Sequence, residues 1–381
     1  MASRIPFNRV NAVGSELAYV GQALAQGHIS GDGPFSQRCE TLLETMLGAP
    51  RVLLTTSCTH ALELSALLLD LEPGDEVVVP AFTFPSTAAA FSLRGARVVF
   101  CDVHESTLNL DERILESLVS ERTKAVVAVH YAGVGCEMDV ILAVAERAGV
   151  AVVEDNAHGL FGRYRGKPLG SFGILATQSF HETKNVTCGE GGALVVNDER
   201  LAARGEVLRE KGTNRKAFFR GEVDKYTWVD EGSSYVPSDL LAAFLAAQLE
   251  ASDLIQASRK RIWHTYTDAL GDWAATVGAR LPYVPDDREQ PYHMFYVLLP
   301  SFEYRTALIE YLRAQGIVAV FHYLPLHLSP MGERHGGRRG QCPVTEGLAD
   351  RLLRLPFYVG LSADEQAEVI DAIIEFEFRE S

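Results

Sequence analysis

The sequence predicts an α/β protein with a doubly wound, mainly parallel sheet in a large domain and a smaller α+β domain at the carboxyl end. Between residues 50 and 200, short β-branched runs alternate with longer amphipathic stretches. Strands that alternate with helices are typical of parallel sheets, because each crossover needs a helix. The chain has 381 residues, 47% of them hydrophobic and 22% charged, which is enough to bury a sizeable core.

Each strand of the predicted sheet is a short apolar run that ends in polar residues. We expect strands at "RVLLT" (51–55), "EVVVP" (76–80), "ARVVF" (96–100), "KAVVAVH" (124–130), "VAVVED" (150–155), "TQSF" (177–180) and "ALVVN" (193–197). Apolar residues at three- and four-residue spacing predict helices at "THALELSALLLD" (59–70), "STAAAFSLRG" (86–95) and "DVILAVAERAG" (139–149). A charged helix is expected at 199–212.

The second half of the chain begins with an irregular, aromatic-rich segment at 213–239. So long a stretch without periodicity usually forms a functional loop or a partner contact. One long helix is then expected over 238–266, followed by a strand at 293–299, a helix at 304–316, a strand at 318–323 and a final helix at 364–378. We therefore expect a large domain of residues 1–250 and a small carboxyl-terminal domain of residues 251–381.

Composition excludes several classes of protein. The formal net charge of -15 opposes binding to nucleic acid, which needs clustered basic residues. The six cysteines form no CxxC pair, so we expect reduced thiols and no structural metal site. The chain has no run of 18 apolar residues, and "MASRIPFNRV" has no apolar core of a signal peptide. We expect a cytoplasmic protein that does not contact a membrane.

In doubly wound sheets, ligands bind at the carboxyl ends of the strands. That rule selects residues 57–59, 83–86, 130–133, 155–158 and 179–184. The last of these stretches, in "SFHETKNVTCGEGGALVVND", places Lys184 between an apolar strand and a glycine-rich turn. A lysine amine that loses its proton near neutral pH attacks carbonyl groups, and a Schiff base with pyridoxal phosphate is the commonest use. The alternative is an ordinary solvated lysine.

Pyridoxal phosphate also needs a carboxylate for its pyridine nitrogen, a group against its ring and a phosphate cradle. Asp155, at the end of "VAVVED", is the candidate carboxylate, and Phe84, in "PAFTFPST", is suited to the ring face. His158 is placed to hydrogen-bond Asp155 or the phenolic oxygen of the cofactor. Candidates for the phosphate share a hydroxyl or a place at a helix amino end: Ser57, Cys58, Thr59 and Ser179.

Each of these residues also has a purely structural interpretation. Asp155 and Ser57 are common helix caps or turn residues, His158 suits a neutral structural histidine, and an aromatic such as Phe84 is more often core. Ser179 could be a strand-end serine. Their occurrence together, in order along the chain, favours the cofactor site.

The order SCT, TF, EDNAH, SFHETKN and GEGG resembles the fold type I pyridoxal-phosphate enzymes, specifically the DegT/DnrJ/EryC1/StrS sugar aminotransferase family. The resemblance covers nearly the whole chain. Stretches such as "VHYAGVGCEMD", "REKGTNR", "DKYTW" and "VFHYLPLH" are similar to the branch that aminates carbon 4 of dTDP-4-keto-6-deoxyglucose. The resemblance implies an aminotransferase with L-glutamate as amino donor and a dTDP-4-amino-4,6-dideoxyhexose as product.

The resemblance also implies roles for the residues. Lys184 would hold the cofactor as an internal aldimine and move protons, and Asp155 would pair with the pyridine nitrogen. Phe84 would stack on the ring, and His158 stands where many relatives carry Gln. The residues implied at the phosphate are Ser57, Cys58, Thr59 and Ser179. Ser234, in "GSSYVPSD", replaces an asparagine that in much of the family reaches the phosphate of the neighbouring subunit, so that contact is open here.

We further expect a homodimer or a dimer of dimers with sites built from two chains. Residues 211–235 carry the densest basic group of an acidic chain, and we expect Lys211, Arg215 and Arg220 there to bind the diphosphate of the nucleotide sugar. Tyr323, in "VFHYLPLH", is expected to contact the substrate as well.

Other interpretations remain open. The substrate alternative is a 3-keto or UDP-linked keto sugar, and the sequence leaves the galacto or gluco configuration of the product open. A nicotinamide-dependent dehydrogenase needs a G-x-G-x-x-G turn, which "GVGCEM" and "GEGGAL" do not supply. A metal hydrolase would have to use His322 and His327, whose spacing does not suit one helical face. A catalytically inactive regulator, or a dehydratase with His at the lysine position, is disfavoured by Lys184.

Overall fold

A seven-stranded sheet forms the centre of the large domain in the computed structural model, which describes residues 4–378. Its strand order is β1-β9-β8-β5-β4-β2-β3, and β9 alone runs antiparallel to its neighbours. The mainly parallel sheet predicted from the sequence is therefore confirmed. The strands are β1 (Arg51–Thr55), β2 (Glu76–Pro80), β3 (Arg97–Cys101), β4 (Thr123–Val129), β5 (Ala151–Asp155), β8 (Leu175–Ser179) and β9 (Gly192–Val196).

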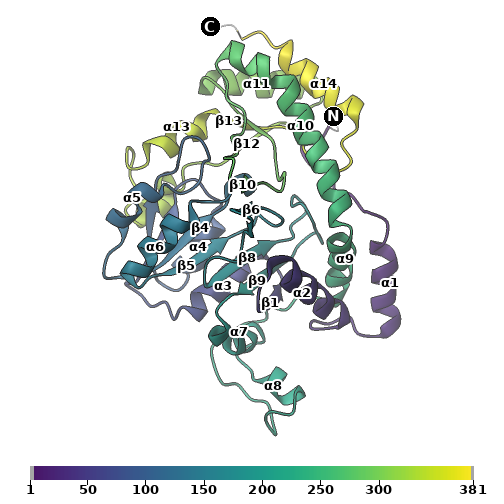
Figure 1. Cartoon of the computed structure of the whole chain (residues 1–381), viewed down its shortest axis with the longest axis vertical. Helices are drawn as coiled ribbons and strands as arrows, with labels where there is room; N and C mark the ends of the chain where they lie inside the picture. The colour runs from purple at the N-terminus through teal and green to yellow at the C-terminus, as the bar shows by residue number, and fades with distance from the viewer. Residues whose placement is uncertain (1–3, 379–381) are drawn as a thin grey trace.

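Helices cover both faces of this sheet, so its strands are buried on both sides (Figure 1). Leu53 and Val77 pack on one face with α3, α4 and α7, whereas Val52 and Val78 pack on the other with α2, α5, α6 and α9. These helices, with α1 packed against α9, are α1 (Glu16–Gln26), α2 (Pro34–Leu47), α3 (Cys58–Leu68), α4 (Ser86–Ser92), α5 (Glu112–Leu118), α6 (Met138–Ala148), α7 (Ala202–Arg209) and α9 (Asp239–Glu250).

The single long helix expected over 238–266 is wrong: two helices, α9 and α10 (Ser252–Val277), meet there at an angle of 64°. The backbone of Ala251 leaves the helical region, with φ -93° and ψ 14°. α9 is buried on nearly all sides beside α1 and α2, whereas α10 turns to cover a separate core. The apolar spacing continues through the bend, so the pattern alone does not reveal it.

The small domain is built on α10 and a three-stranded antiparallel sheet of order β11-β13-β12. The strands predicted at 293–299 and 318–323 are present but shorter, as β11 (Tyr296–Leu298) and β12 (Val320–Phe321). The last helix ends at Ile374, earlier than the predicted 378. The other elements here are α11 (Phe302–Ala314), α12 (Pro330–Arg334), α13 (Pro343–Arg351), β13 (Leu352–Arg354), α14 (Ala363–Ile374) and the 3₁₀ turn η3 (Leu326–Leu328).

The amino-terminal segment crosses to the small domain. Ile5 is fully buried in the core under α10, and its backbone pairs with Ile317. We infer that the boundary between residues 1–250 and 251–381 lies at the α9–α10 bend. The amino-terminal segment around Ile5 is the exception, because it belongs to the first range but packs in the core of the second.

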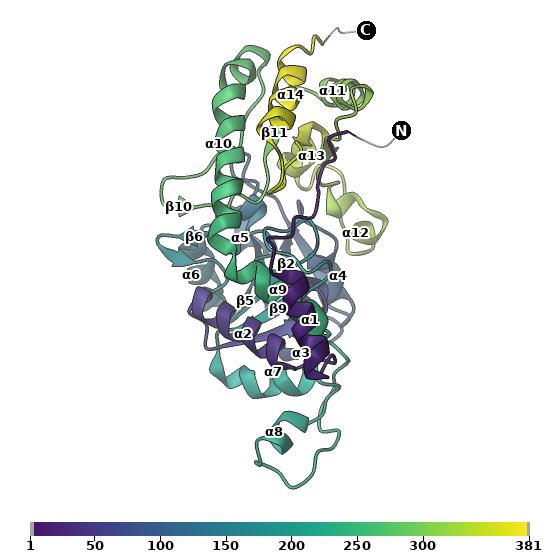
Figure 2. The same ribbon diagram turned by 90° about the vertical axis from the view of Figure 1, so that its right-hand side faces the viewer.

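The remaining elements are short. A second small sheet joins β6 (Arg163–Tyr164), β7 (Lys167–Pro168) and β10 (Arg288–Glu289). It pairs a strand from the second part of the chain with two from the large domain. Two 3₁₀ turns are η1 (Tyr131–Gly133) and η2 (Glu199–Leu201). The irregular segment carries α8 (Arg215–Phe219), which projects from the body of the molecule (Figure 2). In residues 4–378 no single helix has the length and apolar character of a membrane span, although the bent pair α9 and α10 meets both criteria when counted together.

Candidate active site

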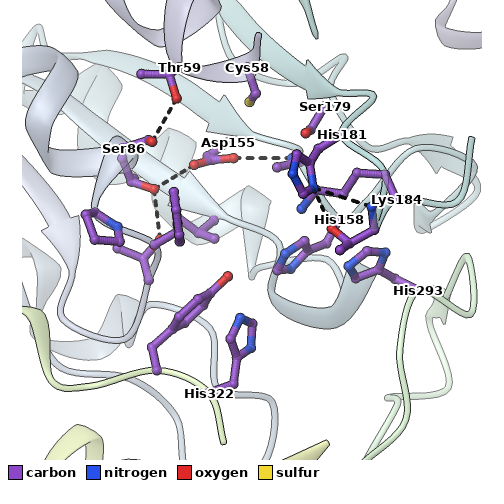
Figure 3. Close-up of a pocket in the computed structure, with 18 of the residues that line it drawn as sticks. Cys58, Thr59, Ser86, Asp155, His158, Ser179, His181, Lys184, His293 and His322 are labelled. Carbon is purple, nitrogen blue, oxygen red and sulfur yellow. Dashed lines mark hydrogen bonds between the residues drawn. The ribbon is translucent and has the colours of Figure 1, made fainter. Parts of the chain in front are cut away.

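A cavity of about 750 Å³ lies where the carboxyl ends of β5 and β8 face the small domain. Figure 3 shows polar side chains from both halves of the chain gathered around it. Its lining includes nine residues singled out from the sequence: Ser57, Cys58, Thr59, Phe84, Asp155, His158, Ser179, Lys184 and Tyr323. The eight of these residues that come from the large domain meet at the strand ends, as the rule predicts, and Tyr323 joins them from the small domain.

Lys184 lies in the turn between β8 and β9, and its backbone N–H donates to the carbonyl oxygen of His181 over 2.9 Å. Burial lowers the pKa of the Lys184 amine to about 8, with the charge of Arg354 acting in the same direction and Asp155 opposing it. A neutral amine is the nucleophilic form, so this environment prepares Lys184 to attack a carbonyl near neutral pH. The alternative of an ordinary solvated lysine does not agree with this position.

Asp155 is buried at the end of β5, and its carboxylate is held in a fixed orientation. Its Oδ2 accepts a hydrogen bond of 2.7 Å from the Thr87 hydroxyl, and its Oδ1 accepts one of 3.2 Å from the backbone N–H of Ala157. Thr83 contacts the Thr87 hydroxyl in turn, at 2.8 Å. A carboxylate positioned in this way can stabilise a protonated ring nitrogen. Thr87 lies one residue beyond the strand-end stretch 83–86.

Ser57 is the N-cap of α3, and its Oγ accepts a hydrogen bond from the backbone N–H of His60. The structural interpretation of Ser57 as a cap is therefore correct, and the cap leaves the first turn of α3 open to the cavity. Thr59 contributes a hydroxyl 2.8 Å from that of Ser86. Backbone donors and the helix dipole favour an anion at this end, so the residues present fit a phosphate group.

Gly192 makes this phosphate cradle possible. It begins β9 opposite Thr55 of β1, directly beneath the first turn of α3. A Cβ at position 192 would lie 2.3 Å from the carbonyl carbon of Ser57 and 2.4 Å from the backbone nitrogen of Cys58. Only glycine lets the strand approach the helix so closely, which explains one glycine of the "GEGG" stretch.

Two histidine rings stack in the cavity wall beside Lys184. The rings of His158 and His293 have centroids 4.3 Å apart and planes 17° apart, and His293 Nδ1 lies 2.8 Å from Asn185 Oδ1. Burial lowers the pKa of both rings well below the usual value, so both are neutral. His158 Nδ1 is buried without a hydrogen-bond partner in the described chain, which fits a contact with a bound group.

Phe84 and Tyr323 form the mouth of the cavity. Phe84 is 57% exposed, so its interpretation as a core residue is wrong, and its ring centroid lies 6.2 Å from that of Tyr323. His322 also lines the cavity and contacts the Tyr131 hydroxyl at 3.0 Å. His327 is instead buried against Glu346 and is not part of the cavity lining, so the two histidines of the hydrolase alternative do not share a site.

Lys211, Arg215 and Arg220 do not line this cavity in the described chain. They lie on or next to the projecting segment around α8, where carboxylates contact each of them. Lys211 and Arg215 are ion-paired with Glu210, and Arg220 with Glu206. The structure therefore does not bring these three expected substrate contacts to the cavity of their own chain.

Comparisons with known proteins agree with this geometry. The model of the DegT/DnrJ/EryC1/StrS aminotransferase family matches residues 11–374. The spore coat polysaccharide biosynthesis protein SpsC of Bacillus subtilis is 34% identical over 366 residues, covering 94% of this chain and 93% of that protein.

Two solved structures illustrate the likeness in three dimensions. The putative sugar aminotransferase Spr1654 of Streptococcus pneumoniae, in its PMP form, superposes with a TM-score of 0.91 at 26% identity, covering 97% of this chain and 98% of that one. S. venezuelae DesV superposes with a TM-score of 0.89 at 31% identity, covering 98% of both chains.

Proposed function

We propose, on the premise that this chain belongs to the DegT/DnrJ/EryC1/StrS aminotransferase family, that it moves the amino group of L-glutamate to carbon 4 of dTDP-4-keto-6-deoxyglucose. The chain is a sugar aminotransferase of fold type I that depends on pyridoxal phosphate. The observation that carries the aminotransferase chemistry is the amine of Lys184, with its lowered pKa, beside Asp155 and the open end of α3. The choice of sugar rests on the stretches that resemble the carbon-4 branch of the family. A cytoplasmic location is part of the proposal.

Pyridoxal phosphate, when bound, supplies an electron sink and carries the amino group from one substrate to the other. In this proposal, Asp155 keeps a proton on the pyridine nitrogen, because its carboxylate is already oriented by Thr87. Ser57, Cys58, Thr59 and Ser179 hold the phosphate at the end of α3. Phe84 lies against the ring, and His158 offers its unpartnered Nδ1 to the bound group.

Lys184 has two tasks in this mechanism. Its Nζ would hold the cofactor at the cofactor's carbonyl carbon, until the incoming amino donor takes that place. The freed amine would take the proton from the donor's α-carbon. Burial lowers its pKa to about 8, so a fraction of the amine is uncharged near neutral pH and can accept that proton. In the second half of the reaction the same Nζ returns a proton to carbon 4 of the sugar.

The choice of substrate is tested by incubating the purified, cofactor-loaded protein with L-glutamate and one keto sugar at a time. We expect dTDP-4-keto-6-deoxyglucose to give an amino sugar and 2-oxoglutarate, detected by mass spectrometry. A UDP-linked 4-keto sugar and a 3-keto sugar serve as comparison substrates, and preferential amination of either would refute the substrate assignment. Proton coupling constants of the product then decide between the galacto and gluco configurations.

The active unit is, in this proposal, a homodimer or a dimer of dimers in which the segment 211–235 of one chain reaches the cavity of another. Two observations support it. The segment projects from its own body and leaves Phe219, Tyr226 and Trp228 from 54% to 76% exposed. The apolar side chains of Phe84 and Leu324 are also exposed at the cavity mouth. Contact with a second chain would cover them. Ser234 is exposed on the same segment, so its contact with a partner's phosphate stays open.

Neutral substitutions on this segment should weaken binding of the nucleotide sugar only. We expect Arg215→Gln and Arg220→Gln each to raise the KM for the nucleotide sugar about 10-fold, because each loses one charged contact to a diphosphate. The KM for L-glutamate should stay unchanged. Arg200→Gln is the matched control, since Arg200 is an exposed arginine with an ion pair to Asp198 outside the segment.

Equal effects on both substrates would mean that the segment supports the fold and that the diphosphate binds elsewhere. Light scattering after gel filtration tests the assembly itself. A fully active monomer at the assay concentration would contradict the two-chain site.

A further inference from the structure

Asn185, the residue after Lys184, is buried, and its hydrogen bonds fix which way its amide faces. Its Nδ2 donates to the carbonyl oxygen of Pro291 over 2.6 Å, and its Oδ1 lies 2.8 Å from Nδ1 of His293. A backbone carbonyl oxygen only accepts hydrogen bonds, so the amide nitrogen must face Pro291 and the amide oxygen must face His293. Asn185 itself is not part of the cavity lining in the described chain.

This orientation sets the position of the hydrogen on the His293 ring. Because Oδ1 of Asn185 only accepts, the hydrogen must be on Nδ1 of His293. Burial lowers the pKa of His293 well below its usual value, and the charges of Lys184 and Arg259 act in the same direction. The ring is therefore neutral, with a lone pair on Nε2. The backbone of His293 is held as well, since Arg259 donates a hydrogen bond to its carbonyl oxygen.

The ring of His158 is placed by packing alone. Within residues 4–378 its Nδ1 is buried without a partner, and the carboxylate of Asp155 accepts from Thr87 and from the backbone of Ala157 rather than from His158. The ring stacks on that of His293, with centroids 4.3 Å apart and planes 17° apart, and both lie beside Lys184 (Figure 3). Of the two partners expected for His158, Asp155 is not engaged, which leaves the phenolic oxygen of the cofactor.

We propose that Asn185 is a positioning residue, which through the ring of His293 sets the plane in which His158 donates a hydrogen bond to the phenolic oxygen of pyridoxal phosphate. This inference rests on the proposed function in requiring that pyridoxal phosphate occupies the cavity, and it does not depend on the amino donor or the keto sugar. A neutral imidazole carries a single hydrogen, so it donates to an oxygen only while its ring points that way. Because the two rings are nearly parallel, a tilt of His293 is passed on to His158.

The simpler interpretation is that Asn185 only ties the turn between β8 and β9 to Pro291. A comparison within the chain favours the longer route. Asn197 does tie a turn, and its amide donates to the backbone carbonyl oxygens of Gly170 and Gly173 over 3.0 and 2.8 Å. Asn185 instead directs its oxygen to a ring of the cavity wall.

The test measures how each variant discriminates between pyridoxal phosphate and 3-deoxypyridoxal phosphate, an analogue without the phenolic oxygen. Cofactor-free protein is titrated with each compound, and binding is followed by absorbance. Wild type should bind pyridoxal phosphate more tightly. His158→Phe should lose about 10-fold of that preference, because it removes a hydrogen bond to a charged oxygen. Asn185→Ala should lose at least about 3-fold, as expected when that hydrogen bond is misaligned rather than removed.

His293→Phe separates the two interpretations. It keeps an aromatic face against His158 and leaves the hydrogen bond from Asn185 to Pro291 in place, but it removes the link between Asn185 and the stack. It should also lose at least about 3-fold of the preference, since the ring is no longer held in one plane. This variant decides the question if Asn185→Ala does not fold.

A double variant and a control complete the design. Adding Asn185→Ala to His158→Phe should cause no further loss of preference, because the side chain through which Asn185 acts is already gone. Asn197→Ala is the matched control. It removes an asparagine with two hydrogen bonds to backbone outside the cavity lining, and it should keep the wild-type preference.

Two results would overturn the proposal. One is an unchanged preference in both Asn185→Ala and His293→Phe, which would leave Asn185 as an anchor of the turn. The other is a further loss when Asn185→Ala is added to His158→Phe, because Asn185 would then act by another route. If wild type binds the two compounds equally, His158 makes no such hydrogen bond, and this inference fails while the proposed function stands. If wild type binds neither compound, the proposed function fails as well.

Discussion

Lys184→Ala is expected to abolish transamination, with a loss of about 10⁴-fold or more in turnover, while the fold persists. The reason is that one amine both binds the cofactor and moves the proton, so both tasks fail together. The side chain lies at the cavity wall rather than in a packed core, so thermal unfolding of the cofactor-free protein should change little. Turnover is measured as release of 2-oxoglutarate from L-glutamate in the presence of the keto sugar.

Two further variants sharpen this test. Lys184→Arg should be as inactive as alanine, because a guanidinium does not lose its proton in proteins. Lys260→Ala, at an exposed lysine of α10, is the matched control and should retain full turnover. Near-normal turnover of Lys184→Ala would refute the whole mechanism. If Lys184→Ala does not fold, the turnover of Lys184→Arg is compared with that of wild type instead.

Asp155→Asn is expected to lower turnover about 100-fold or more, because the amide keeps the shape of the side chain but loses the charge. Asp155 would favour a proton on the pyridine nitrogen, and the asparagine would not, so the cofactor would be a weaker electron sink in the variant. The amide oxygen of the variant can still accept the hydrogen bond that Thr87 donates to Asp155, so the local structure should be preserved. The measurement is the rate of the first half of the reaction, followed by absorbance.

The control for Asp155 is Asp139→Asn, which neutralises an exposed aspartate that is ion-paired with Arg165 on the protein surface. It should leave the rate unchanged. If Asp155→Asn were as fast as wild type, another carboxylate would have to hold the pyridine nitrogen. The assignment of the site around β5 would then be wrong, although the fold would stand.

The part of the site that lies on the large sheet could be predicted from the sequence. Apolar runs mark where strands end, and parallel strands end at one edge, so Asp155 and Lys184 could be brought together without a structure. His293 and Arg354 could not be found in this way. They come from the small domain, and no local pattern shows that this domain closes over the ends of β5 and β8.

Other features were hidden for different physical reasons. The strands β6, β7 and β10 have two residues each, too few to give a period. The bend at Ala251 interrupts the helix without a proline or glycine, because packing on two separate cores imposes it. Thr87 looks like an ordinary helix residue in the sequence. Its hydroxyl matters because α4 starts where it can reach Asp155.

The close approach of Gly192 to the first turn of α3 has a consequence for folding. β1 ends at Thr55 and its partner Gly192 follows 137 residues later, by the difference 192 - 55, so this pairing closes a long loop of chain. Contacts so far apart in sequence are slow to form, because the entropy of loop closure must be overcome first. The phosphate cradle therefore exists only once β9 has joined the sheet. Pyridoxal phosphate can then bind the completed fold but not its precursors, and by mass action it stabilises the native state alone.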